Sequence, residues 1–479
     1  MSEEEEKGFV SKIAKYLPTV EGPTYKQPFN SKIKWTIAAL LMFLVLSSVP
    51  IFGVAKAVYD QYRFYEIVLG SKFGSLMTLG IGPIVTSGII LQLLVGSKII
   101  NWDMNDEKYR KKFQTWSKLL GIVFCVIEAA AFVFFGALTV SGGLPVTIFV
   151  VMQLIAGGII VILLDEIVSK WGFGSGISLF IAAGVANQIF IRALSPISST
   201  CIAGDLSTCL PSSQNPPTGL LWQFFLNLFQ AKYTNMILSL IPILATIVIF
   251  LVVIYIQDMG IEIPLSFSGF RGFGRSWSLK LLYTSNIPVI LAASLVATLQ
   301  VIGRFGLQAG TNGMSCSLLA CYDKNNQIVG GIIYYLTSPT SLLSNIISGT
   351  VTQSDLIRAL TYMIFLSLAA TVFSVFWVST SSMDSASVAE QLEGIGMQIP
   401  GYRGDKKTME GVLNRYIPYL TVIGGLLVGI FAALADFTGA IGTGTGILLT
   451  VMIIYNYYEQ LSAENLEEAH PIIRSILGE

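Results

Sequence analysis

Ten long apolar segments dominate this sequence and restrict what it can fold into. Each is long enough to cross the hydrocarbon core of a bilayer as an α-helix. In lipid, only helices and closed barrels satisfy every backbone hydrogen bond. We therefore predict an all-α polytopic membrane protein with ten transmembrane helices. The predicted helices cover residues 35–53, 76–95, 119–138, 146–167, 177–194, 236–257, 282–302, 356–378, 417–434 and 437–458.

The composition agrees with a chain that lies mainly in lipid. Of its 479 residues, 53% are hydrophobic and 12% are charged, whereas soluble domains contain about a quarter charged residues. Basic and acidic residues number 29 each, so the net charge points to no class of partner. The single histidine, His470, lies in the polar C-terminal tail. We therefore expect no histidine-based catalysis, no metal site and no cofactor.

The positions of the basic residues predict the orientation of the chain. Most of the 29 lysines and arginines fall at the termini and in alternate loops, which makes both termini cytosolic by the positive-inside rule. The start, MSEEEEKGF, is acidic and does not resemble a cleavable signal peptide. We expect a multi-pass protein of the cell membrane. Its expected parts are a cytosolic N-terminal tail (1–34), a first half (35–195), an external loop (196–235), a second half (236–458) with cytosolic loops 258–280 and 379–415 and an external loop 304–354, and a cytosolic C-terminal tail (459–479).

Two of the apolar segments contain a proline at corresponding places in the two halves. Residues 79–95 contain Pro83, and residues 284–299 contain Pro288. Interrupted helices at matching places in an inverted repeat mark a pathway through the membrane. Proline is also common in membrane helices in general, so ordinary helix packing is the alternative.

Charged residues are scarce inside the predicted helices. Glu128 lies in the middle of the segment 119–138, and an ionisable residue at that depth predicts a functional role. The alternative is a glutamate that faces a watery cavity without a specific role. Asp165 and Glu166 are expected to form a solvated helix end. A pathway lined by aliphatic groups favours passage of something large and chemically varied over an ion-coupled solute.

Two glycine-rich runs invite comparison with phosphate-binding loops. GFGSGIS covers residues 172–178, and GTGTG covers residues 442–446. Neither is followed by the lysine that a P-loop requires. Both lead into apolar helices, so we expect the glycines to allow close packing of helices.

The five cysteines fall into two classes. Cys125 lies in an apolar segment, and we expect it to serve packing. The other four lie in predicted external loops, where disulfides persist. We hypothesise the pairs Cys201–Cys209 and Cys316–Cys321, although sequence alone does not determine connectivity.

Five motifs, in order along the chain, resemble the SecY family, the alpha subunit of the Sec protein-conducting translocon, and most closely its archaeal and eukaryotic branch. They are LGIGPIVTSGII, DEIVSKWGFGSGISLFIAAGV, EIPLS followed by a basic loop and YTSNIPVILAA, GMQIPGYR, and GTGILLTVMIIYNYYEQL. The resemblance covers nearly the whole chain. It implies ten helices in two inverted five-helix halves, with a short plug helix after the first helix, at about 61–74.

The resemblance also implies a function. The chain is expected to be the central pore-forming subunit of a protein translocation channel. It would pass secretory polypeptides across the membrane and release transmembrane segments sideways into lipid through a lateral gate, without enzymatic chemistry. The implied partners are a SecE/gamma-type subunit, a beta-type small subunit, the ribosome through its RNA backbone, signal sequences and nascent chains, and membrane lipid.

Matching positions in the motifs imply roles for particular residues. Two pairs of the implied pore residues are spaced i, i+4, so each pair can face one direction on a helix. The pore ring is implied at Ile81, Val85, Ile177, Ile181, Ile290 and Leu449. The plug is implied at Tyr62, Phe64, Tyr65, Ile67, Val68 and Leu69. The lateral gate is implied at Thr86, Glu128 and Thr298, the last where the family has asparagine. Ribosome contacts are implied at Arg271, Arg275, Arg403 and Lys406.

Each of these roles has a plainer alternative. The aliphatic ring residues could pack against lipid, the plug could be a simple external cap, and the basic residues could be ordinary positive-inside charge. For the whole chain, the alternatives are a secondary transporter of inverted-repeat fold and a membrane insertase or scaffold without a pore.

Overall fold

The structure is a computed structural model in which the chain forms two compact units, Met1–Ala183 with Ile453–Glu479, and Gly184–Met452. It describes residues 18–469 except 26, 55–73, 103, 105, 135–137, 139, 141, 199–215, 268–273, 285, 304–307, 310–314, 318, 324–327, 340–341, 395 and 399–405.

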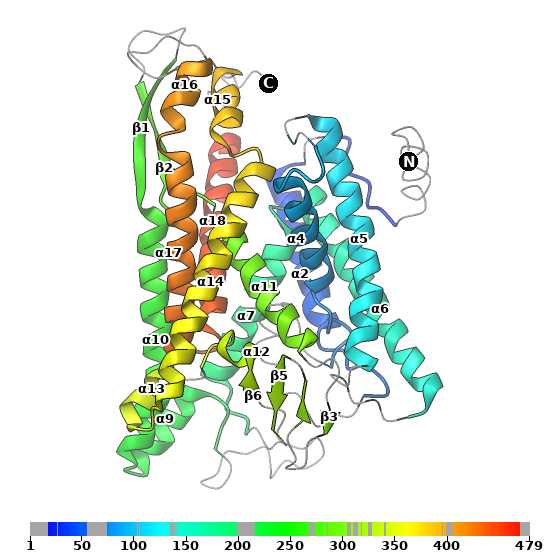
Figure 1. Ribbon diagram of the computed structural model, residues 1–479, viewed down its shortest axis with the longest axis vertical. Coiled ribbons are helices and arrows are strands. Elements are labelled where there is room, and N and C mark those ends of the chain that lie inside the picture. The colour runs from blue at the N-terminus through cyan, green and yellow to red at the C-terminus, as the bar shows by residue number, and fades with distance from the viewer. Residues whose placement is uncertain are drawn as a thin grey trace. The chain divides into compact units, whose positions relative to one another are not determined.

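Apolar helices build the first unit (Figure 1). They are α2 (Phe29–Leu46), α4 (Gly82–Gly96), α5 (Glu107–Phe134), α6 (Leu144–Trp171) and the first part of α7 (Gly176–Leu194). In this unit α5 packs against both α4 and α6, and α2 packs against α6.

The second unit combines helices with two small sheets (Figure 1). Its helices are α9 (Leu220–Phe229), α10 (Tyr233–Asp258), α11 (Ile287–Ile302), α12 (Ile332–Tyr335), α13 (Leu342–Ser348), α14 (Gln353–Thr380), α15 (Ser385–Gly394), α16 (Lys406–Leu413), α17 (Ile417–Phe437) and the start of α18 (Gly444–Ala469). One sheet has the order β2-β1-β7, from β1 (Gly260–Phe267), β2 (Gly274–Lys280) and β7 (Met397–Gln398). The other has the order β3-β4-β5-β6, from β3 (Gln308–Ala309), β4 (Ser315–Cys316), β5 (Ala320–Tyr322) and β6 (Ile328–Gly331).

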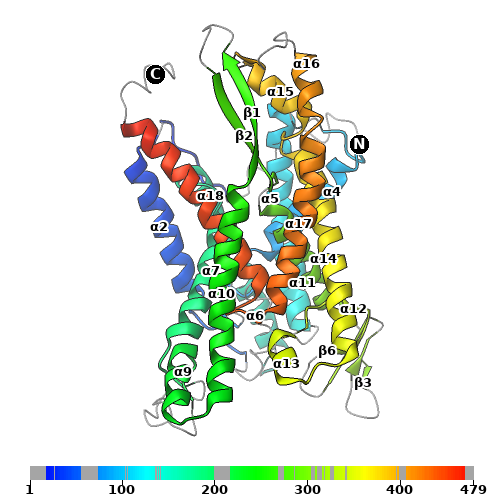
Figure 2. The same ribbon diagram turned by 90° about the vertical axis from the view of Figure 1, so that its left-hand side faces the viewer.

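Seven helices within the described residues are long and apolar enough to cross a membrane. They lie in α2, α5, α6, α7, α10, α14 and α17. The helices α4 and α11 are shorter and contain no charged residue, and α18 begins with an apolar half. These ten helices correspond to the ten predicted spans. The additional helix α9, within the loop 196–235, packs against α10 (Figure 2).

Several helices begin or end elsewhere than their apolar segments predict. The first spanning helix starts at Phe29, directly after Pro28, so residues 29–34 are already helical. Helix α5 begins twelve residues before the predicted start, at Glu107, because charged residues extend it beyond its apolar part. Helix α17 continues to Phe437, and residues 438–443 form the turn before α18.

Both prolines that were expected inside spanning helices lie in a first helical turn instead. Pro83 is the second residue of α4, and Pro288 is the second residue of α11. Proline has no N–H, and the first N–H groups of a helix have no partner within the helix, so proline is well suited to this position. The expectation of internally broken helices is therefore wrong: the chain reaches α4 through turns at 75–81 instead.

Small residues allow α17 to approach α14 closely. A Cβ atom added at Gly429 would lie 2.5 Å from the Cα of Ser367, and one added at Gly425 would lie 2.8 Å from the Cβ of Ser374. The Ser374 hydroxyl also donates a hydrogen bond to the backbone oxygen of Thr421, at 2.7 Å. Close backbone approach with hydroxyl cross-links is typical of helix packing in membranes.

Within the predicted cytosolic loop 258–280, the described residues form two paired β-strands that continue from α10 (Figure 2). Strands β1 and β2 are antiparallel, with Gly260 opposite Lys280 and Ser266 opposite Gly274. Ile263 and Leu279 are buried in a cluster with residues of α15, α16 and α17. The hairpin was not predicted, although apolar residues alternate along β1.

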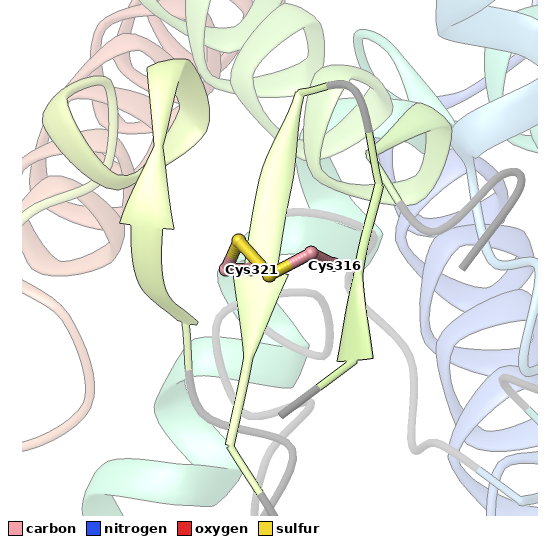
Figure 3. The surroundings of a disulfide bond; sticks show 2 residues. All are labelled: Cys316 and Cys321. Carbon is pink, nitrogen blue, oxygen red and sulfur yellow. A yellow bond between two sulfur atoms is a disulfide. The ribbon is translucent and has the colours of Figure 1, made fainter. Parts of the chain in front are cut away.

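The hypothesised Cys316–Cys321 disulfide is present (Figure 3). It joins β4 and β5 at positions that face each other in the strand register. The hypothesised Cys201–Cys209 pair lies outside the described residues. Cys125 is a free, buried cysteine, and a Cβ atom at Gly158 would lie 2.7 Å from its sulfur. Its expected packing role is therefore confirmed.

We predict that the stability of the protein depends on the close contact between α14 and α17. Gly429→Ala should destabilise the protein by about 2 kcal/mol, because the added methyl group overpacks the contact with Ser367. Gly411→Ala is the matched control, since a Cβ atom there meets nothing within 4 Å and alanine favours the helix. Thermal unfolding of the purified full-length protein should show a lower Tm only for Gly429→Ala. Equal Tm values for the two variants would contradict the packing analysis.

Candidate functional site

The expected pore residues of the first unit all lie at the starts of helices. Ile81 directly precedes α4, and the Val85 N–H donates a hydrogen bond to the Ile81 oxygen at 3.0 Å. Ile177 and Ile181 lie in the first two turns of α7. Ile81, Val85 and Ile181 are buried, and Ile177 is half-buried. Each pair is therefore presented on successive turns, as the i, i+4 spacing predicts.

The expected pore residues of the second unit occupy the same kind of position. Ile290 is the fourth residue of α11, and Leu449 is the sixth residue of α18. Both are buried. Position at a helix start is thus a property that all six residues share, and the sequence predicted it only for Ile177 and Ile181.

Glycines fix where three of these four helices begin. Gly80 before α4, Gly174 before α7 and Gly442 before α18 have φ values of +51°, +64° and +93°. Side chains disfavour this region of backbone space, whereas glycine enters it freely. These three glycines therefore set the turns that precede the helices of the ring residues.

Two of the three expected gate residues are in direct contact. The Thr86 hydroxyl of α4 donates a hydrogen bond to Oε1 of Glu128 in α5, at 3.0 Å. The Thr298 hydroxyl instead donates to the Ser294 oxygen of its own helix, at 2.9 Å. The polar contact that the structure shows therefore joins two neighbouring helices of the first unit.

The other expected site residues fall mainly outside the described part of the chain. This applies to all six plug residues, Tyr62, Phe64, Tyr65, Ile67, Val68 and Leu69, and to Arg271 and Arg403. Arg275 lies in β2 opposite Leu265, and Lys406 is the first residue of α16.

Asp165 and Glu166 do not form a freely solvated helix end. Glu166 forms ion pairs with Lys118 at 2.8 Å and Lys170 at 3.3 Å. The Asp165 carboxylate accepts a hydrogen bond from the Ile177 N–H at 2.9 Å. Both carboxylates thus have specific partners, and the expectation of a solvated end is wrong.

Sequence reasoning did not identify a buried carboxylate at Asp436, near the end of α17. It accepts hydrogen bonds from the Tyr362 hydroxyl at 2.7 Å and from the Thr445 N–H at 2.8 Å. The Thr445 hydroxyl donates to it as well. The available signal was an aspartate shortly before a Gly-x-Gly-x-Gly run, the pattern that also follows Asp165. Among the described residues, no group of three or more His, Cys, Asp or Glu side chains could hold a metal ion.

Comparisons with known proteins agree over nearly the whole chain. Residues 75–458 match the SecY family model. The protein translocase subunit SecY of Methanothermobacter thermautotrophicus is 40% identical over 468 residues, which cover 97% of each chain. Among solved structures, a SecY whose plug domain stabilises the closed state of the translocation channel superposes with a TM-score of 0.79 at 39% identity, over 96% of this chain and 98% of that one. Sec61 in the canine ribosome-channel complex superposes with a TM-score of 0.78 at 39% identity, over the same shares.

The fold and these similarities define a protein-conducting channel of the ten-helix, all-α membrane class. The chain belongs to the SecY family. It is accordingly a channel subunit for polypeptides and not an enzyme, and the secondary-transporter alternative is rejected.

Proposed function

We propose that Ile81, Val85, Ile177, Ile181, Ile290 and Leu449 form the ring through which a translocating polypeptide passes. The observation that supports this most is their shared position at helix starts. Non-helical backbone is tolerated at membrane depth only where protein covers it or where it lines a cavity. Helices that begin after such a turn therefore mark the pathway, as discontinuous helices do in other membrane transport proteins.

An aliphatic ring suits a substrate of any sequence. Isoleucine, valine and leucine offer no specific hydrogen bonds, so the ring can close around varied side chains. When the pore is empty, an apolar constriction loses its water and blocks ions. The segment at about 61–74 is proposed as the plug, by analogy with the SecY plug domain that maintains a membrane seal.

Site-specific photocrosslinking tests the ring. A crosslinker placed at position 290, 81 or 181 should react with a stalled, ribosome-bound secretory chain, because the chain must pass these side chains. Positions 247 and 251 on α10, whose side chains are exposed on an apolar helix, are the lipid-facing controls and should not react. Robust ribosome binding without a crosslink at any ring position would refute the ring.

We propose that Thr86 and Glu128 belong to a lateral gate that releases transmembrane segments and signal sequences into lipid. Their hydrogen bond joins α4 to α5, so it makes these two helices one side of the gate. Thr298, which bonds within its own helix, would supply little polar attraction from another side. A gate with few polar contacts opens in response to the hydrophobicity of the segment that enters it.

Two substitutions at the gate should shift the insertion threshold in opposite directions. Glu128→Leu replaces a half-buried carboxylate by an apolar group that packs well, so the closed gate should be stabilised and the required hydrophobicity should rise. Thr86→Val removes the hydroxyl that donates to Glu128 and should lower the hydrophobicity that insertion requires. A shift of about 1 kcal/mol in apparent insertion free energy is expected. Thr115→Val, which removes only a bond to the Lys111 oxygen within α5, is the control. Unchanged thresholds in both variants would argue against this gate.

The basic loops are proposed as the ribosome-binding surface, through Arg271, Arg275, Arg403 and Lys406. Two observations support this. The loops 258–280 and 379–415 are anchored on one buried cluster, in which β1 and β2 pack against α15, α16 and α17. Sec61, which has a similar fold, is found in a ribosome-channel complex. By family membership, a SecE/gamma-type subunit and a beta-type subunit are proposed as further partners in the membrane.

Charge reversal tests ribosome binding. Arg271→Glu with Arg403→Glu should weaken binding at moderate salt. The plot of log affinity against log salt should also become less steep by about 1.5, since each lost phosphate contact reduces the magnitude of its negative slope by roughly 0.7–0.9. Arg192→Glu, in the last turn of α7, with Lys232→Glu, in the loop proposed as external, is the control. Wild-type binding of the first variant would contradict the assignment.

Binding to sealed vesicles with the cytosolic face outward also tests the proposed orientation, in which both termini are cytosolic in a cell-membrane protein.

The domain boundaries are proposed to follow the same orientation. Helices from 35–195 and 236–458 would be the two inverted halves, joined by the external loop 196–235. A tail tagged beyond residue 459 should then be accessible from the same side as the ribosome.

A further inference from the structure

Two turns in the chain have the same construction, one in each compact unit. The first joins α6 to α7, and the second joins α17 to α18. In both, an aspartate near the end of the first helix is followed by alternating glycines, and the second helix contains proposed ring residues. The proposed pore does not by itself account for the aspartates.

In the first unit, Asp165 binds the beginning of α7. Its carboxylate accepts from the N–H of Ile177, the second residue of α7, at 2.9 Å, and the Gly176 N–H is a further donor. The Tyr457 hydroxyl closes the same turn by donating to the Ser175 oxygen at 2.8 Å. Ile177 is itself a proposed ring residue, so the carboxylate holds the backbone of the pore lining directly.

In the second unit, Asp436 binds the beginning of α18 in the same way. Its carboxylate accepts from the N–H of Thr445, the second residue of α18, at 2.8 Å. The Gly444 N–H is again a further donor. Leu449 follows Thr445 by four residues, on the next turn of α18.

The glycines allow the carboxylates to come this close. A Cβ atom at Gly176, the first residue of α7, would lie 2.6 Å from the Cα of Asp165. A Cβ atom at Gly444, the first residue of α18, would lie 1.8 Å from the carbonyl carbon of Ala435. Two residues earlier in each turn, Gly174 and Gly442 have positive φ. The same three elements therefore recur in the same order in both units.

The physical role of this arrangement follows from helix ends. The first N–H groups of a helix have no partner within it, and at membrane depth no bulk water replaces that partner. A carboxylate at this position satisfies two N–H groups and also interacts favourably with the positive end of the helix dipole.

We propose that Asp165 and Asp436 are paired positioning residues that fix the starts of α7 and α18, and thereby hold Ile177, Ile181 and Leu449 in place for the closed pore. The proposal rests on the pore ring proposed above. Neither aspartate touches the translocating chain, and each acts through the helix start that it binds.

The test compares Asp165→Ala and Asp436→Ala in the full-length protein, reconstituted in liposomes, by amide hydrogen exchange and by ion leak. Exchange in the first turn of α7 should become about fivefold faster in Asp165→Ala while α18 is unchanged, and Asp436→Ala should give the reverse pattern. Ion leak through the resting channel should rise severalfold in both. A merely structural role would lower the amount of folded protein without raising leak per folded channel.

Three further variants keep the test decisive. Glu166→Ala removes the neighbouring carboxylate, which binds Lys118 and Lys170 and not α7, and should leave exchange in α7 and leak unchanged. Asp165→Asn and Asp436→Asn keep an acceptor oxygen and should show smaller changes, which remain measurable if the alanine variants fail to fold.

The outcomes are distinct. Unchanged exchange at both helix starts overturns the proposal. Faster exchange without leak also overturns it, provided that Ile181→Ser, a substitution in the ring itself, does leak. If Ile181→Ser does not leak, the pore ring is wrong, and the pore role of the aspartates falls with it. The exchange pattern would then still report whether the aspartates bind the helix starts.

Discussion

Backbone polar groups that have no partner are the constraint on which this structure most depends. A helix in lipid satisfies its own interior, but its first N–H groups require another solution. Four helices that contain the proposed ring residues solve the problem in two ways. Proline at the second position of α4 and α11 removes one of the N–H groups. Asp165 and Asp436 accept hydrogen bonds from the corresponding groups of α7 and α18.

Close packing then holds the helices that these starts define. In the second unit, Gly425 and Gly429 bring α17 against α14. In the first unit, a Cβ atom at Gly157 of α6 would lie 1.9 Å from the Leu76 oxygen, so α6 presses directly on the turn that leads to Ile81. The positions of the ring residues thus depend on glycines in neighbouring helices as well as on their own segments.

The sequence predicted those features that depend on long segments or local spacing. Apolar length predicted the spans, and the i, i+4 spacing predicted that Ile81 and Val85 occupy successive turns. The Cys316–Cys321 pair was predicted from two cysteines in one polar loop. The pairing of Thr86 with Glu128 was expected only from family resemblance.

The sequence did not predict where several helices start, the short hairpin, or contacts between residues that are far apart in the chain. A proline within an apolar segment does not reveal whether the helix continues through it or starts beside it, and Pro83 and Pro288 start their helices. The β1–β2 hairpin was concealed because its alternation is short and lies among charged residues. Asp436 was overlooked because its partners, Tyr362 and Thr445, are distant from one another in sequence.

The segment between α11 and α14, which is proposed as external, is anchored to both helices. The Tyr322 hydroxyl of β5 donates to the Gln300 oxygen of α11 at 3.3 Å. Arg358 of α14 donates to the Thr337 oxygen at 2.9 Å and to its hydroxyl at 2.8 Å. Between these two anchors the segment is shortened by the Cys316–Cys321 crosslink and its small sheet. The end of α11 near Gln300 and the start of α14 near Arg358 are therefore tethered to each other through this segment, so a displacement of one of these helix ends pulls on the other.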